Sequence, residues 1–292
     1  MNKQPILHIE NLNKIFKVRK SKLFEEQKIL HAISDVSIDI YEGETMGVIG
    51  ESGCGKSTFG RCIVRLHEAT SGKIIFNGVD INGISGKDLK NLRRKIQMIF
   101  QDPYSSLDPR KTAGNIIEEP LIVHNLMDGQ KRKEKVAFLM KEVGLDEQHM
   151  HRYPHEFSGG QRQRINVARA LALNPKIIVC DEPVSALDVS VQSQVLNLLN
   201  SIQKEHQLTM IFISHDLSVI KHVSDRIAIM YLGRIVELCK SEEIYTNAKH
   251  PYTQLLLSAI PPESPFEKTQ KIEVKGEIPS PIGEQIGCPY AS

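Results

Sequence analysis

Apolar and polar positions near the start of the chain predict a strand, a loop and a helix in that order. Val36–Ile40 alternate with a period of two, which predicts a half-buried strand, and Thr45–Ile49 form a short apolar run that stops at Gly50. After a glycine-rich loop, apolar residues recur at helical spacing, which predicts an amphipathic helix from about Lys56 to Leu66.

The next segments predict a hairpin and a group of helices. Lys73–Phe76 and Val79–Ile81 flank Asn77-Gly78, a dipeptide that readily adopts the backbone angles of a tight turn, so an antiparallel excursion is expected here. From about residue 102 to 172 the pattern becomes mostly helical and charged. A small helical subdomain is expected over this range.

Further along, strands alternate with helices. Ile177–Cys180 and Thr209–Ile213 are apolar runs typical of buried strands, and a helix is expected between them from about Val191 to Lys204. Such alternation predicts a mostly parallel sheet covered on both faces, hence an α/β fold. Beyond Leu238 we expect two short helical segments and then, over residues 261–292, a tail too rich in proline to carry a core.

Composition narrows the classes of function. The 292 residues include 37 Lys and Arg against 35 Asp and Glu, and this net charge of +2 lacks the basic excess typical of a nucleic-acid binder. No apolar run approaches the ~18–20 residues that cross a bilayer, and the N-terminus does not lead into a signal-peptide pattern. The five scattered cysteines form no Cys-x-x-Cys pair, which favours a reducing cytosol.

The glycine loop carries the strongest chemical signal. Residues 50–58 read GESGCGKST, which fits the phosphate-loop pattern of two glycines followed by Lys and Ser, between a predicted strand and a predicted helix. Backbone N–H groups and the start of the helix would hold phosphate oxygens, Lys56 the β- and γ-phosphates, and Ser57 a Mg²⁺ ion. The predicted nucleotide-binding residues of this loop are Gly50, Ser52, Gly53, Cys54, Gly55, Lys56, Ser57 and Thr58.

Two carboxylates follow the apolar run at Ile177–Cys180. Asp181 and Glu182 would lie at the carboxyl end of a strand, where open α/β sheets place their ligands. Asp181 is expected to assist the metal and Glu182 to polarise the attacking water. An acidic pair after a strand can also be a plain helix cap, but the phosphate loop in the same chain favours the catalytic interpretation.

A second glycine-rich helix start occurs at Ser158-Gly159-Gly160-Gln161. Its glycines would leave N–H groups available at the start of a helix that runs to about Leu173, so it is a candidate anion receptor. The alternative is a glycine-rich helix entrance that binds no ligand.

These motifs resemble the ATP-binding cassette family, the ATPase subunits of ABC transporters. In family order the chain has the phosphate loop, the Q-loop at Gln101, the signature at Ser158 to Gln161, the Walker B strand ending at Asp181, the D-loop Ser185-Ala186-Leu187-Asp188 and the switch histidine His215. The resemblance implies a P-loop NTPase fold over residues 1–260: a mostly parallel sheet core, an antiparallel β subdomain and a helical signature subdomain.

The resemblance also implies roles for three further residues. Gln101 would join the Mg²⁺ shell and link the site to the membrane domains, and His215 would contact the γ-phosphate. Phe16 occupies the position where the family stacks an aromatic ring on adenine. A structural histidine and an ordinary strand-edge phenylalanine are the alternatives.

Longer strings are similar to one branch of the family, the oligopeptide, dipeptide and nickel importers, and especially to their F-type ATPase subunit. They are DPYSSLDPR at 102–110, RYPHEF at 152–157 and HPYTQ at 250–254. The segment from Ile278 to Pro289 resembles the start of the branch's cysteine-bearing tail, but Cys288 alone cannot supply the roughly four thiolates of an iron–sulfur cluster.

The function expected from this resemblance is ATP hydrolysis coupled to uptake of oligopeptides or dipeptides by a bacterial ABC importer. ATP and Mg²⁺ would be the cofactors. The expected partners are a paralogous D-type ATPase in a heterodimer, two transmembrane permeases and, indirectly, an extracellular binding protein, with no nucleic acid. The chain would lie at the cytoplasmic face of the membrane.

Three alternatives remain. A nickel or metallophore importer would use the same ATPase machinery. A soluble ABC ATPase of DNA repair or translation is disfavoured by the single cassette and the near-neutral charge. A nucleotide-binding subunit that has lost catalysis is disfavoured because Gln101, Glu182 and His215 are all present.

Overall fold

The computed structural model describes residues 4–18, 27–259, 282–283, 287 and 290. The chain divides into two compact units. The first comprises Met1–Gly83 with Ile213–Ser292, and the second Ile84–Phe212.

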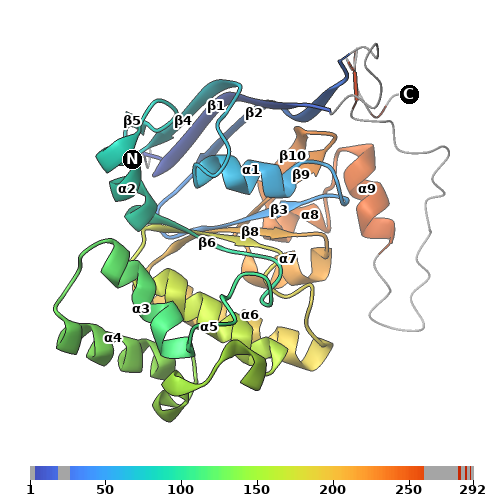
Figure 1. Ribbon diagram of the computed structural model, residues 1–292. Helices are drawn as coiled ribbons and strands as arrows, with labels where there is room; N and C mark the ends of the chain where they lie inside the picture. The colour runs from blue at the N-terminus through green and yellow to red at the C-terminus, as the bar shows by residue number, and fades with distance from the viewer. Residues whose placement is uncertain (1–3, 19–26, 260–281, 284–286, 288–289, 291–292) are drawn as a thin grey trace, which may run out of the picture. The chain divides into compact units, whose positions relative to one another are not determined.

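The first unit contains an antiparallel sheet with the strand order β2-β1-β4-β5 (Figure 1). Its strands are β1 (Leu7–Lys17), β2 (Ile29–Ile40), β4 (Ser71–Phe76) and β5 (Val79–Asp80). The turn between β4 and β5 uses Asn77 at φ 48° and Gly78 at φ 79°, as expected of a tight hairpin turn. The predicted antiparallel excursion is therefore confirmed.

The first unit also carries the strands and helices around the glycine loop. Every residue of β3 is buried, and β3 pairs in parallel with β9, which pairs antiparallel with β10. The elements are β3 (Thr45–Ile49), α1 (Lys56–Ile63), α7 (Leu217–Val223), β9 (Arg226–Tyr231), β10 (Arg234–Lys240), α8 (Ser241–Ile244) and α9 (Pro251–Ser258). The predicted order of strand, loop and helix is confirmed.

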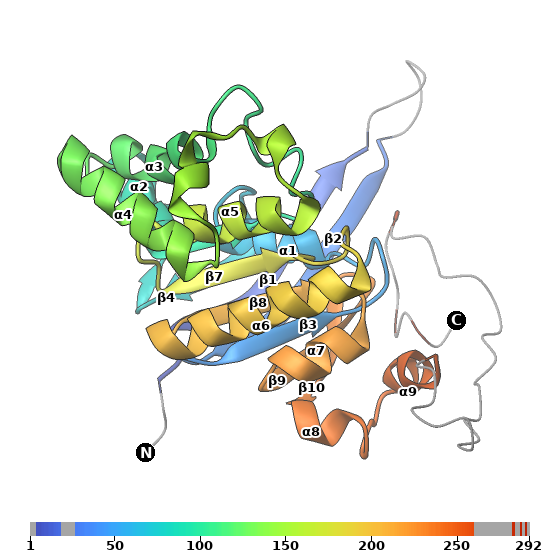
Figure 2. The same ribbon diagram turned by 90° about the horizontal axis from the view of Figure 1, so that it is seen from below.

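The second unit combines parallel strands with the helical segment. Strand β6 pairs in parallel with β7, and helices α3, α4 and α5 gather into one group (Figures 1 and 2). The elements are α2 (Gly86–Lys95), β6 (Ile96–Ile99), α3 (Ala113–Val123), α4 (Gly129–Glu142), η1 (Glu147–His151), η2 (Pro154–Glu156), α5 (Gly159–Leu171), β7 (Ile177–Asp181) and α6 (Val189–His206). Strand β8 (Thr209–Ser214) crosses from this unit into the first at residue 213.

Several element boundaries differ from the sequence-based expectations. Helix α1 ends at Ile63 rather than near Leu66, because Arg65 adopts the left-handed conformation at φ 57°. Leu66 is consequently 49% exposed instead of lying on an apolar helix face. Helix α5 ends at Leu171, two residues before the expected end. The strands β1, β6, β9 and β10 and the helices α2 and α7 were not predicted.

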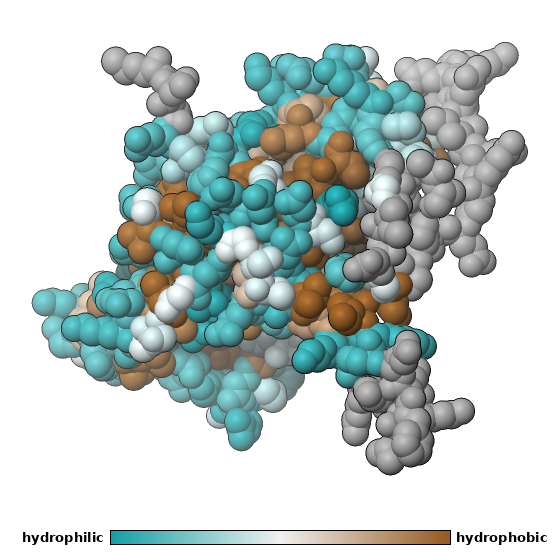
Figure 3. Space-filling view, turned by 90° about the horizontal axis from the view of Figure 1, so that it is seen from above, coloured by the Kyte–Doolittle hydropathy of each residue, from teal (hydrophilic) through white to brown (hydrophobic). Residues whose placement is uncertain are grey.

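The tail expected over residues 261–292, including Cys288, lies largely outside the described residues. Among the residues that the structure does describe, none belongs to a helix long and apolar enough to cross a membrane. The face drawn in Figure 3 mixes hydrophilic residues with apolar patches.

Candidate functional site

The phosphate loop connects β3 directly to α1. Helix α1 is preceded by Gly55 at φ 105°, and no side chain caps its N-terminus. The side chain of Lys56 is buried, and its ammonium donates hydrogen bonds to the carbonyl oxygens of Gly50 at 2.7 Å and Glu51 at 2.9 Å. The loop therefore brings a cation and an uncapped helix start together, the two features that attract phosphate.

Two glycines of the loop lie too close to neighbouring backbone to be replaced. A Cβ atom on Gly50 would lie 2.0 Å from the carbonyl oxygen of Met230. A Cβ atom on Gly55 would lie 2.1 Å from the carbonyl oxygen of Ala32. Because both obstacles are backbone atoms of strands, glycine is required at these positions.

The other predicted loop residues differ in their exposure. Ser52 and Gly53 are exposed, and Ser57 and Thr58 are half-buried at the start of α1. The thiol of Cys54 is buried, and burial raises its pKa although the Lys56 ammonium opposes the shift. Cys54 therefore fills space as a neutral thiol rather than acting as a nucleophile.

Phe16 and His215 also belong to the first unit. Pairing of β1 with β4 ends at Asn13, so Phe16 pairs only with Leu30 of β2. The Lys14 ammonium lies 4.8 Å from the centroid of the Phe16 ring, and His67 meets the ring edge-on at 5.5 Å. His215 is exposed and follows the last residue of β8.

The second unit places Gln101 beside Glu182. Asp181 ends β7 and is 1% exposed, and Glu182 follows at φ 47°. The amide nitrogen of Gln101 donates a hydrogen bond to the Glu182 carboxylate at 2.9 Å. A left-handed glutamate is strained, and strain of this kind clusters at functional sites.

The signature segment forms a self-capped helix start. The Ser158 hydroxyl accepts a hydrogen bond from the Gln161 backbone N–H at 3.3 Å, and the Gln161 side chain accepts one from the Ser158 N–H at 3.0 Å. This reciprocal capping box begins α5. The Cβ positions of Gly159 and Gly160 face side chains, those of Leu187 and Val191 respectively.

The sequence analysis missed three residues that fasten the segment after Gln101 to α5. The Arg162 guanidinium lies 3.9 Å from the Tyr104 ring centroid. Arg169 donates to the Ser106 carbonyl at 2.6 Å, and Asn166 donates to the Ser106 hydroxyl at 2.8 Å. Their spacing of i, i+4 and i+7 on one helix face was the signal available in the sequence.

A fourth missed residue is Tyr252 on α9, whose hydroxyl accepts a hydrogen bond from the Glu51 backbone N–H at 3.0 Å. The string HPYTQ had marked this position only as part of a resemblance.

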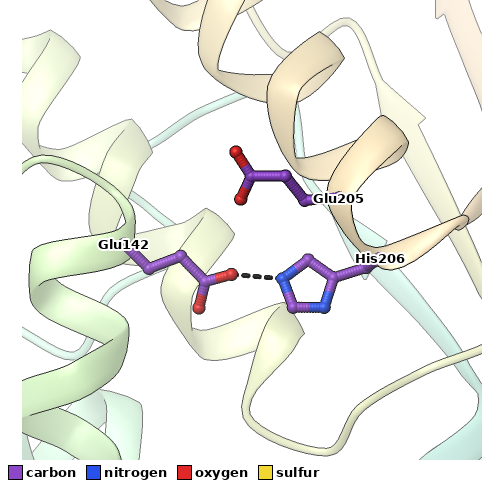
Figure 4. Close-up of side chains that lie close together, drawn as sticks. All are labelled: Glu142, Glu205 and His206. Atoms are coloured by element: carbon purple, nitrogen blue, oxygen red, sulfur yellow. Dashed lines mark hydrogen bonds and ion pairs between the residues drawn. The ribbon is translucent and has the colours of Figure 1, made fainter.

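A polar cluster outside the motifs joins two helices. Glu142 of α4 is hydrogen-bonded to His206 at the end of α6, and Glu205 lies beside them (Figure 4). The adjoining cavity of about 320 Å³ is also lined by Lys135 and Lys176. Because these two ammonium groups would repel a bound metal ion, we interpret the cluster as a hydrogen-bonded contact between α4 and α6 and not as a metal site.

Two family models match the chain. Residues 33–185 match the ABC transporter model, and residues 236–292 match the model of the oligopeptide/dipeptide transporter C-terminal region.

Individual proteins and structures agree with these matches. The chain is 50% identical over 292 residues to the oligopeptide transport ATP-binding protein AppF of Bacillus subtilis, covering 99% of this chain and 89% of that protein. It is 50% identical over 290 residues to OppF of Escherichia coli, covering 98% of this chain and 87% of that protein. A solved dimer of the ATP-binding cassette MJ0796 with ADP and Pi is 32% identical, with a TM-score of 0.71, covering 80% of this chain and 98% of that chain.

The expected α/β cassette fold is thus confirmed by both the strands and the structural neighbour. The chain belongs to the ABC transporter family, as an ATPase subunit whose C-terminal region is of the oligopeptide/dipeptide transporter type.

Proposed function

We propose that this chain hydrolyses ATP to drive the uptake of oligopeptides or dipeptides through a bacterial ABC importer. The observation that carries the proposal is the 50% identity, over nearly the whole chain, to proteins named for oligopeptide transport. The match at residues 236–292 agrees with it, because that model describes the C-terminal region of such transporters.

The first unit fits a nucleoside triphosphate. Lys56 would exchange the loop carbonyls for the β- and γ-phosphates, and the uncapped start of α1 would bind phosphate oxygens. Phe16 would stack on the base through a ring face. Because stacking hardly depends on the identity of the base, the site should discriminate poorly between ATP and GTP. His215 would contact the γ-phosphate.

The residues also fit a magnesium ion. Ser57, Gln101 and Asp181 offer hydroxyl, amide and carboxylate oxygens, which are the ligands that Mg²⁺ prefers. The amide nitrogen of Gln101 faces Glu182, so its amide oxygen is the atom suited to the cation. When bound, Mg²⁺ would neutralise phosphate charge during phosphoryl transfer.

Glu182 is the proposed catalytic residue. Its carboxylate is held by the Gln101 amide and would accept a hydrogen bond from the attacking water, orienting it in line with the bond to be broken. Lys56 and the loop N–H groups would stabilise the charge that develops on the phosphate oxygens.

The signature at Ser158 to Gln161 would complete the nucleotide site of a facing subunit. We propose that this subunit is a paralogous D-type ATPase. Both ATPases would dock on two permeases, which receive their substrate from an extracellular binding protein. ATP offers a γ-phosphate to both surfaces and ADP does not, so association is expected to depend on ATP. Residues 1–260 would form the nucleotide-binding domain, with the helical subdomain at about 102–172.

Replacing Glu182 with Gln tests the enzymatic part. The amide keeps the shape but loses the charge that orients water, so turnover by the assembled transporter should fall at least about 100-fold while ATP affinity stays the same. Glu205→Gln, an exposed change on α6, is the matched control and should keep parental turnover. Parental turnover of Glu182→Gln would refute the catalytic assignment.

Uptake tests the substrate. Cells that lack this gene should lose uptake of labelled di- and oligopeptides and regain it with the parental chain but not with Glu182→Gln. Loss of nickel uptake with normal peptide uptake would replace the peptide proposal by the metal-importer alternative.

A further inference from the structure

The segment before the last described helix is hydrogen-bonded to the middle of β10, at Glu237. The Glu237 carboxylate accepts hydrogen bonds from the backbone N–H groups of Lys249 at 2.8 Å and His250 at 3.0 Å. The His250 ring then accepts one from the Tyr252 N–H at 3.2 Å and caps α9. These bonds fix the first turn of α9, and with it the backbone of Tyr252.

Tyr252 reaches from α9 to the phosphate loop. Its side chain is 1% exposed, and its hydroxyl accepts the Glu51 N–H. The carbonyl oxygens of Gly50 and Glu51 both accept from Lys56, so Tyr252 and Lys56 together hold the Gly50–Glu51 peptide group, and Lys56 holds the next one as well. Burial raises the pKa of Tyr252, so its hydroxyl stays neutral at physiological pH.

A residue near the end of the chain packs over this tyrosine. The Tyr290 ring lies 6.0 Å from the Tyr252 ring, 5.6 Å from the Tyr231 ring and 5.5 Å from the His250 ring, measured between centroids. The rings of Tyr231 and Tyr252 lie 4.5 Å apart. This aromatic cluster restricts the position of the Tyr252 hydroxyl.

We propose that Tyr252 is a positioning residue for the phosphate loop and that Tyr290 acts on the loop through it. Without the Tyr252 hydroxyl, the Glu51 N–H loses its acceptor. The Gly50–Glu51 peptide group, whose carbonyl oxygen accepts from Lys56, then becomes more mobile. Nucleotide binding must then pay the entropy of ordering the loop. The C-terminal region thereby sets the affinity for nucleotide. The proposal rests on nucleotide binding at the loop and not on the identity of the transported substrate.

Titration of the full-length chain with fluorescent ADP tests the role of Tyr252. ADP isolates the loop from residues that need a γ-phosphate. Tyr252→Phe keeps the ring and removes one hydrogen bond, so the Kd for ADP should rise about three- to tenfold.

Tyr245→Phe is the matched control. Its hydroxyl donates to the Leu217 carbonyl at 2.9 Å, so the variant loses a comparable bond that does not touch the loop. It should keep the parental Kd. Equal Kd values for Tyr252→Phe and the parent, or an equal rise in Tyr245→Phe, would overturn the proposal.

A double-mutant cycle tests the route from Tyr290. Tyr290→Leu should raise the Kd about twofold in the parent and not at all in the Tyr252→Phe background. Full additivity would show that Tyr290 does not act through the Tyr252 hydroxyl.

Steady-state kinetics distinguish a positioning role of Tyr252 from a general loss of structure. In the assembled transporter, Tyr252→Phe should raise the KM for ATP and leave kcat within about twofold. A fall in kcat with unchanged KM would contradict the proposal. Failure of peptide uptake with the ADP effect intact would instead refute only the proposed substrate.

Discussion

The chain contains two glycine-rich helix starts that are built in opposite ways. Helix α1 begins after Gly55 with no side-chain cap, whereas α5 begins after Ser158 with a reciprocal capping box closed by Gln161. A helix start needs partners for its first N–H groups. The N–H groups at the start of α1 are therefore available to a ligand, whereas the signature supplies a partner for one N–H group from its own Ser158 side chain.

The glycines at the two helix starts also differ in what surrounds them. Gly55 faces the carbonyl oxygen of Ala32, while Gly159 faces the end of the Leu187 side chain at 3.2 Å. Backbone of a paired strand cannot move aside, but a leucine side chain can rotate. The phosphate loop is thus confined by backbone at Gly55, whereas the signature has room for adjustment at Gly159, although not at Gly160, whose Cβ would lie 2.3 Å from Val191.

The largest expected effect is the difference between alanine at the two glycines. Gly55→Ala places a Cβ against backbone at φ 105°, so the free energy of unfolding should fall by about 2–4 kcal/mol. Gly159→Ala should change it by less than about 1 kcal/mol. Urea denaturation of both variants measures the two values, and equal losses would mean that the two starts are equally rigid.

The next effect concerns the ligand of the uncapped start. Lys56→Ala removes the cation on the β- and γ-phosphates, so the Kd for ATP should rise about 10- to 100-fold. Lys73→Ala, on the exposed part of β4, is the control and should bind ATP as the parent does. Calorimetric titration gives both constants. Unchanged affinity in Lys56→Ala would place the nucleotide elsewhere.

The smallest effect concerns the self-capped start. Ser158→Ala removes the hydroxyl that accepts the Gln161 N–H, which should lower the free energy of unfolding by about 1 kcal/mol. Ser193→Ala, on the exposed side of α6, should have little effect. If both variants match the parent in urea denaturation, the capping box contributes nothing to stability.

The sequence predicted those parts of the fold whose patterns are local. The strand at Thr45–Ile49 and the turn at Asn77-Gly78 were predicted because periodicity and turn chemistry act over a few residues. Helix α1 was predicted too long because apolar spacing does not report the left-handed conformation of Arg65. The local apolar periodicity that predicted the strand at Thr45–Ile49 did not lead to a prediction of β9 and β10.

The site residues, like the fold, were predicted from residue patterns only where the pattern is local. Lys56 and Glu182 were found because each belongs to a contiguous motif. The contact from Tyr252 to Glu51 joins residues 201 positions apart, and no local pattern encodes such a contact. The hydrogen bond from Gln101 to Glu182 spans 81 positions, and only the family resemblance had put both residues at one site.

The account rests on the claim that this chain's own loop binds ATP without help from its own signature. Titration of the isolated full-length Ser158→Arg variant with ATP tests that claim, with the parent and Lys56→Ala measured alongside. Ser158→Arg should bind ATP with the parental Kd, because its signature would serve only a facing subunit. A Kd as weak as that of Lys56→Ala would show that the signature belongs to the chain's own nucleotide site, and would contradict the account.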